Sequence, residues 1–130
     1  MARQSKIASK IVIKILNNSI GISSRYFLEK TSNLLYNLLV GEGDAKSRLR
    51  ENELLVSYIL ALEIPTEFRE KQKHILNLLS KKEALKIEDK IIVSSFQNSI
   101  SSIKNVTASK IIKQINSLYF EVKCFGNESE

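Results

Sequence analysis

Apolar residues recur three and four positions apart along almost the whole chain, a spacing typical of helices that bury one face. This pattern predicts a first amphipathic helix over about residues 4–19 and a second from about residue 24 to Val40. Gly21 ends the first of these helices, and Ser23 or Ser24 can cap the second. The residues of the second helix that we expect to face inward are Phe27, Leu28, Leu34, Leu35, Leu38 and Leu39.

The clearest break in the pattern is Gly41-Glu42-Gly43-Asp44, because glycine permits a positive φ angle and Asp44 is a favourable N-cap. A third helix is therefore expected from about Ala45 to Leu62. Its inward residues should be Leu49, Leu55, Val56, Ile59 and Leu62.

Pro65 fits the first turn of a fourth helix, where its missing N–H costs no hydrogen bond. This helix should end near Leu79, just before the exposed pair Lys81-Lys82. Its apolar residues are Phe68, Ile75, Leu76 and Leu79. A fifth helical segment is predicted over about Glu88–Ile103, although the β-branched run Ile91-Ile92-Val93 also fits a short strand.

The last helix has the most regular pattern, and Thr107 can cap its start. Its apolar residues are Ala108, Ile111, Ile112, Ile115, Leu118, Tyr119 and Val122. Residues 126–130 are expected to form a flexible polar tail. The chain is therefore predicted to be an all-α, single-domain bundle of five or six helices over residues 1–125.

The composition, with 43% hydrophobic and 26% charged residues, is that of a globular domain. The longest apolar runs have three or four residues, too few to span a bilayer, so we expect no integral membrane association. A single cysteine, Cys124, excludes an internal disulfide and a cysteine-based zinc site; we expect it to be partly buried. No cofactor or metal is expected. The predicted location is the cytoplasm, with a mitochondrial transit peptide as the alternative interpretation of the basic N-terminus.

Positive charge is concentrated at the start of the chain. Residues 1–50 carry nine Lys/Arg against three Asp/Glu, whereas residues 51–130 carry eleven of each, and the first 28 residues contain no acid. On the first predicted helix, four cations fall within an arc of about 80° opposite the apolar face. We call these residues the basic stripe: Arg3, Lys6, Lys10 and Lys14.

A one-sided charge of this kind predicts an anionic partner, either nucleic acid or an acidic protein surface. A solvated helix face is the alternative, and a membrane surface ranks lower because the apolar face holds no aromatic residue. Arg48 and Arg50 extend the positive region, although Glu51 and Glu53 neutralise part of it. The four tyrosines are expected in or beside the core rather than as base-stacking platforms: Tyr26, Tyr36, Tyr58 and Tyr119.

The segment Arg69-Glu70-Lys71-Gln72-Lys73-His74 resembles the Arg-x4-His core of the HEPN ribonuclease superfamily, whose members are small all-α domains. In that family an Arg and a His from each of two protomers meet and cleave RNA, with the His as acid or base. The resemblance implies these roles for Arg69 and His74. Glu70 departs from the family, which has Asn, Asp or His at that position, and His74 is the only histidine in the chain.

Three further segments are similar to a loose group of short, uncharacterised bacterial helical proteins: Gly41-Glu42-Gly43-Asp44-x-x-x-Arg48-Leu49, Ile64-Pro65-x-Glu67-Phe68-Arg69 and the closing Leu118-Tyr119. They consist of turns, caps and core positions, so the similarity implies a bacterial cytoplasmic origin and no particular activity.

The leading hypothesis from the sequence is a non-enzymatic, cytoplasmic helical adaptor or accessory subunit that binds through its basic N-terminal face. Its size, charge and helical build are similar to those of small helical subunits in nucleoprotein complexes, including bacterial defence complexes, an analogy at the level of fold alone. Two alternatives stay open: a HEPN-like ribonuclease acting through Arg69 and His74, and an antitoxin or immunity-type protein that sequesters a partner. The sequence leaves the oligomeric state open.

Overall fold

The computed structural model describes residues 24–128, which form six helices and one two-stranded hairpin. The first described helix covers residues 24–40 and is called the 24–40 helix below. The others are α2 (Ala45–Glu51), α3 (Glu53–Ala61), α4 (Thr66–Leu78), α5 (Ser95–Ser101) and α6 (Asn105–Glu128). The hairpin consists of β1 (Leu85–Ile87) and β2 (Lys90–Val93). The predicted all-α bundle is confirmed, with the hairpin as an addition; the helix predicted over residues 4–19 lies outside the described residues.

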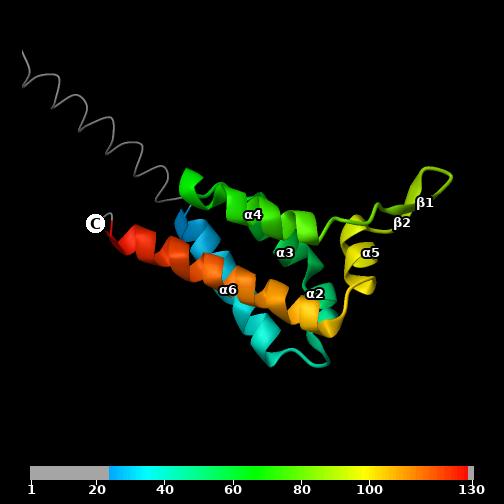
Figure 1. Cartoon of the computed structure of the whole chain (residues 1–130), viewed down its shortest axis with the longest axis horizontal. Coiled ribbons are helices and arrows are strands. Elements are labelled where there is room, and N and C mark those ends of the chain that lie inside the picture. Colours follow the sequence, from blue (N-terminus) through cyan, green and yellow to red (C-terminus); the bar gives the residue numbers. More distant parts are fainter. Residues whose placement is uncertain (1–23, 129–130) are drawn as a thin grey trace, which may run out of the picture.

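The longest helix, α6, lies between the 24–40 helix and α4 in the view of Figure 1 and packs against α2 and α4, with the 24–40 helix antiparallel to it. Its inward stripe is fully or almost fully buried, as the spacing predicts. These residues are Ala108, Ile111, Ile115, Leu118 and Val122. The helix begins at Asn105, so Thr107 lies inside it rather than at its cap, and it extends to Glu128, past the expected start of the polar tail.

The predicted third helix is divided into α2 and α3 at Asn52. The Asn52 Nδ2 donates to the carbonyl oxygen of Arg48 at 2.8 Å, the acceptor that the Asn52 backbone N–H would use in a continuous helix. That N–H donates instead to Leu49 O at 3.2 Å. Asparagine side chains compete with the backbone in this way, and here the competition breaks the helix.

Three other expectations about burial are wrong. Leu39 and Leu76, predicted to face inward, are 76% and 41% exposed, because the helices that carry them already bury a neighbouring stripe. Tyr26, Tyr36 and Tyr58 are exposed rather than core residues. The Tyr26 and Tyr58 rings pack edge to face with their centroids 6.1 Å apart. Cys124 is exposed rather than partly buried.

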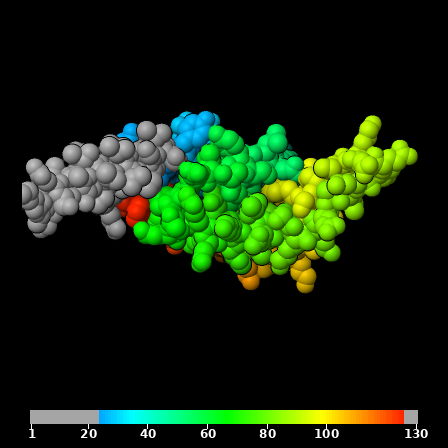
Figure 2. Space-filling model, turned by 90° about the horizontal axis from the view of Figure 1, so that it is seen from above, coloured from blue at the N-terminus to red at the C-terminus, as the bar shows by residue number. Residues whose placement is uncertain are grey.

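The segment predicted to be helical from Glu88 begins instead with the hairpin, so the strand alternative for Ile91-Ile92-Val93 is the correct one. β1 and β2 pair antiparallel, and the register shifts between Leu85 and Lys86. Four β-branched and leucine side chains of the hairpin are exposed: Leu85, Ile87, Ile91 and Ile92. The hairpin extends away from the helices at one end of the molecule (Figures 1 and 2).

The turn of the hairpin holds two non-glycine residues with positive φ angles, 51° at Glu88 and 67° at Asp89. A two-residue turn with both residues in this region is the type I′ turn, which favours Asn-Gly. Left-handed backbone costs a residue with a Cβ roughly 1–2 kcal/mol. The turn therefore holds the strands at the expense of local stability.

We predict that the double substitution Glu88→Asn and Asp89→Gly stabilises the hairpin by about 1 kcal/mol, because it relieves this backbone cost. Amide hydrogen exchange in residues 85–93 should slow about five-fold, a factor that corresponds to this free energy. The melting temperature of the helices should change little compared with the stability of the hairpin, since the hairpin projects from the helices. Unchanged exchange in β1 and β2 would contradict the prediction.

Candidate functional site

The basic stripe, Arg3, Lys6, Lys10 and Lys14, lies outside the described residues. Of the other two cations predicted to bind, Arg50 is exposed and Arg48 is partly buried. The Arg48 Nε donates to Gly43 O at 3.0 Å, and its Nη1 donates to Leu38 O at 3.2 Å. Arg48 thus satisfies one carbonyl at the end of the 24–40 helix and one in the turn that follows, so it has a structural role that its charge alone did not indicate.

The turn that follows the 24–40 helix is fixed by polar contacts to the start of α6. Asp44 caps α2 as predicted, with its Oδ1 accepting from Ser47 N at 2.9 Å. The Asn105 Nδ2 donates to Asp44 Oδ2 at 3.2 Å, and Asn105 Oδ1 accepts from Lys46 N at 3.1 Å. The Lys46 Nζ in turn donates to Ser101 O at 3.1 Å. We call these four residues, Asp44, Lys46, Ser101 and Asn105, the polar corner.

The pKa of Asp44 is lowered from its ordinary value of 3.8. The largest cause is the hydrogen bond from the Ser47 backbone N–H, and contacts with the Ser47 and Asn105 side chains and the charge of Lys46 act in the same direction. Hydrogen bonds to a carboxylate favour its ionised form. The polar corner therefore depends on the charge of Asp44.

A groove of about 710 Å³ opens beside the polar corner, between the 24–40 helix and α6. Its lining residues are Leu35, Tyr36, Leu38, Leu39, Gly43, Asp44, Ala45, Arg48, Ser109, Ile112, Lys113 and Asn116. One wall is apolar, and its two most accessible side chains, Tyr36 and Leu39, are 65% and 76% exposed. Lys113, also exposed, adds a cation on the opposite wall.

Sequence reasoning missed this groove, although a signal for it exists. The 24–40 helix buries one stripe at Phe27, Thr31, Leu34 and Leu38. A second stripe, Leu28, Leu35 and Leu39, lies at spacings of seven and four residues along the neighbouring face. We call these three residues the side stripe. Two adjacent apolar stripes on one helix indicate two packing partners, whereas we expected a single inward face.

The HEPN-like pair lies on α4, and both Arg69 and His74 are exposed. Residues five positions apart on a helix point about 140° away from each other, so the two side chains leave α4 in different directions. The Arg69 Nε donates to Ile64 O at 3.2 Å, which holds the loop before α4. Within one chain the two residues therefore do not form a joint site.

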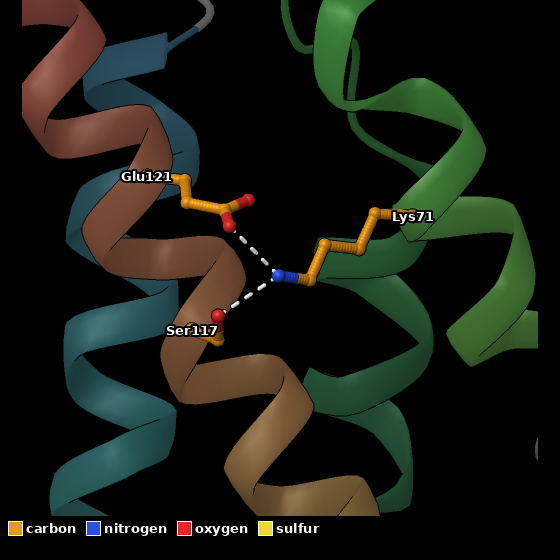
Figure 3. A network of polar contacts seen from close by, with 3 residues as sticks. All are labelled: Lys71, Ser117 and Glu121. Carbon is orange, nitrogen blue, oxygen red and sulfur yellow. Dashed lines mark hydrogen bonds and ion pairs between the residues drawn. The ribbon is translucent and has the colours of Figure 1, made fainter.

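The residues between Arg69 and His74 have structural contacts that the sequence did not indicate. The buried Gln72 donates through Nε2 to Ile59 O at 3.1 Å and to Leu62 O at 2.9 Å, at the end of α3. The Lys71 Nζ contacts Ser117 Oγ at 2.8 Å and Glu121 Oε1 at 2.9 Å, and so joins α4 to α6 (Figure 3). This segment anchors α4 on two sides.

We predict that Asp44→Ala lowers the melting temperature at neutral pH, because it removes the N-cap of α2 and the contact with Asn105. The carboxylate has a lower pKa in the folded state, so its contribution is present above pH 3.8 and is lost as the pH falls through the lowered pKa. The difference from wild type should therefore narrow in acid. Asp44→Asn keeps a capping oxygen without the charge, so its melting temperature at neutral pH should lie between those of the wild type and Asp44→Ala. Equal melting of wild type and Asp44→Ala at neutral pH would exclude this role.

We also predict that the purified protein leaves RNA intact, and that His74→Ala does not change this result. The physical reason is that Arg69 is already engaged by Ile64 O within the chain, while Glu70 departs from the family pattern. The measurement is electrophoresis of structured and single-stranded RNA after incubation with each protein, with Lys73→Ala as the matched control at an exposed neighbour. Cleavage that only His74→Ala abolishes would instead establish the ribonuclease alternative.

Within residues 24–128, no group of three or more His, Cys, Asp or Glu side chains is arranged to hold a metal ion. Nor does any helix in that range have both the length and the hydrophobicity needed to cross a membrane. Comparison with family models, with curated proteins and with solved structures gave no match. The function proposed for this chain therefore rests on its own residues.

Proposed function

We propose that this chain is a non-enzymatic, cytoplasmic helical adaptor that binds nucleic acid through the basic stripe. The observation that carries the proposal is the distribution of charge: four cations share one predicted helix face within a segment of 28 residues that contains no acid. Successive cations one helical turn apart can follow a phosphate backbone, and each neutralised phosphate releases counterions. An acidic protein surface is the second partner that such a stripe would fit.

Four cations of the described residues are already engaged by oxygens of the bundle. Lys46, Arg48, Arg69 and Lys71 each donate to a carbonyl, hydroxyl or carboxylate oxygen of the bundle. A cation held in this way gives up part of its capacity to bind a partner. Arg50, by contrast, is exposed on α2 and fits a role as an additional contact.

We predict that binding to a duplex weakens as salt rises, with log K falling against log salt at a slope of about −3 to −4 for four phosphate contacts. Replacing Lys6, Lys10 and Lys14 by Gln leaves only Arg3 of the stripe and should reduce the slope to about −1. Stability should change little, since exposed charges contribute little to folding. The measurement is fluorescence anisotropy on duplex and single-stranded probes at several salt concentrations.

The matched control replaces Lys81, Lys82 and Lys86 by Gln. These three exposed lysines lie in or just before the hairpin, and their replacement removes the same total charge as the stripe variant. This control should bind like the wild type. If both triple variants lose affinity equally, binding follows net charge and the basic stripe has no special role. If neither the wild type nor the control binds any probe at low salt, the partner is not a nucleic acid, and titration with an acidic protein or polyglutamate becomes the deciding experiment.

A further inference from the structure

The groove between the 24–40 helix and α6 presents apolar surface that the described elements leave open to solvent. Its most accessible apolar residue, Leu39, belongs to the side stripe with Leu28 and Leu35, which pack only partly against the core. Ile112 of α6 lies on the other wall and is likewise partly buried. Contiguous apolar surface of this kind on a helical bundle indicates a missing packing partner.

The same chain contains a segment with the matching surface. Residues 4–19, predicted from their sequence to form an amphipathic helix, place Ile7, Ile11 and Ile15 one turn apart on a single face. The middle of the basic stripe lies about 100° from the middle of that face, with individual cations about 60° to 140° away. A helix of this pattern buries its apolar side against another element and leaves its charged side in water.

Chain length fixes where such a helix can reach. Four residues, 20–23, connect the predicted helix to the 24–40 helix, a connection length common between antiparallel helices. At a rise of 1.5 Å per residue, Ile7 lies about 18 Å from residue 19, and Tyr36 lies about 18 Å from residue 24. An antiparallel return therefore brings Ile7 level with Tyr36, on the wall of the groove.

We propose that residues 4–19 fold back antiparallel to the 24–40 helix and seat their apolar face in this groove. The occupant is the chain's own segment rather than that of a second copy, because a short connection gives the attached segment an effective concentration in the millimolar range. Seated in this way, the segment covers Leu35 and Leu39 of the side stripe and leaves the basic stripe accessible beside the contact. The seat itself does not depend on what the stripe binds; only its use in orienting the stripe rests on the proposed function.

Disulfide trapping tests the seat and its register. In a Cys124→Ser background, which removes the single native thiol, the pair Ile7→Cys and Tyr36→Cys is oxidised under mild conditions. The matched control pairs Tyr36→Cys with Ile15→Cys, on the same predicted face but about 12 Å further along the axis. A disulfide needs Cβ atoms about 4 Å apart, so the first pair should form an intramolecular bond at least ten-fold faster than the control.

The products are separated on non-reducing gels, and the linked peptides are identified by mass spectrometry. Equal rates for the two pairs would overturn the proposal, because they mean that the segment has no fixed register in the groove. Predominantly intermolecular disulfides would overturn it in favour of a segment exchanged between two copies. Tyr36 and Cys124 are exposed, so their replacement leaves no cavity in the described bundle and should preserve folding.

The seat and the proposed function fail independently. The trapping rate should be unchanged from low to high salt, and unchanged when Lys6, Lys10 and Lys14 are replaced by Gln, because the contact is apolar. Nucleic-acid binding should fall under both changes. Rapid trapping without nucleic-acid binding would support the docking of residues 4–19 in the groove and reject nucleic acid as the partner. Nucleic-acid binding without selective trapping would support the partner and reject the docking.

Discussion

The whole bundle depends on the continuous buried stripe of α6. Because this stripe repeats at three and four residues over about four turns, α6 can contact α2 near its start and α4 further along. Truncating one fully buried leucine or isoleucine to alanine in such a stripe costs about 2–5 kcal/mol, a large part of the stability of a domain of this size. α2 and α4 lie directly against α6, whereas α5 packs on α2, and α3 packs on α2 and α4.

The apolar stripe does not determine how the helix ends and connections are held; polar side chains near the helix ends do this. Arg48, Asn52, Arg69 and Gln72 each donate to a backbone carbonyl that a helix end or loop leaves without a helical partner. An unpaired carbonyl inside a protein costs free energy comparable to a lost hydrogen bond. These four residues therefore hold the helix ends and connections to which they donate.

This division explains which parts of the fold the sequence predicts. Helix positions follow from periodicity, which is why the turn before Asp44, the Pro65 helix start and the buried face of α6 agree with expectation. The break at Asn52 could not be predicted from periodicity, because its cause is a single side-chain hydrogen bond to Arg48 O and the apolar pattern continues across it. A short strand at Ile91-Ile92-Val93 was predicted only as an alternative, and the hairpin was not predicted, since Glu88-Asp89 lacks the glycine that usually indicates a type I′ turn.

The candidate site was less predictable than the fold, for a physical reason. Charge can be counted along a sequence, but whether a cation is free to bind depends on the oxygens that surround it in three dimensions. Arg48 and Lys71 look like binding residues by charge and are held by Leu38 O and Glu121.

The basic stripe differs from these cations because of its place in the sequence. The first acid of the chain is Glu29, fifteen residues after Lys14, so no neighbour in the same predicted helix can neutralise the stripe. Burial of the opposite, apolar face would then hold the four cations in a fixed row at little further cost in side-chain order. An amphipathic segment can in this way serve the fold with one side and a partner with the other, and the two proposals together would give the apolar groove and the charge asymmetry one common explanation.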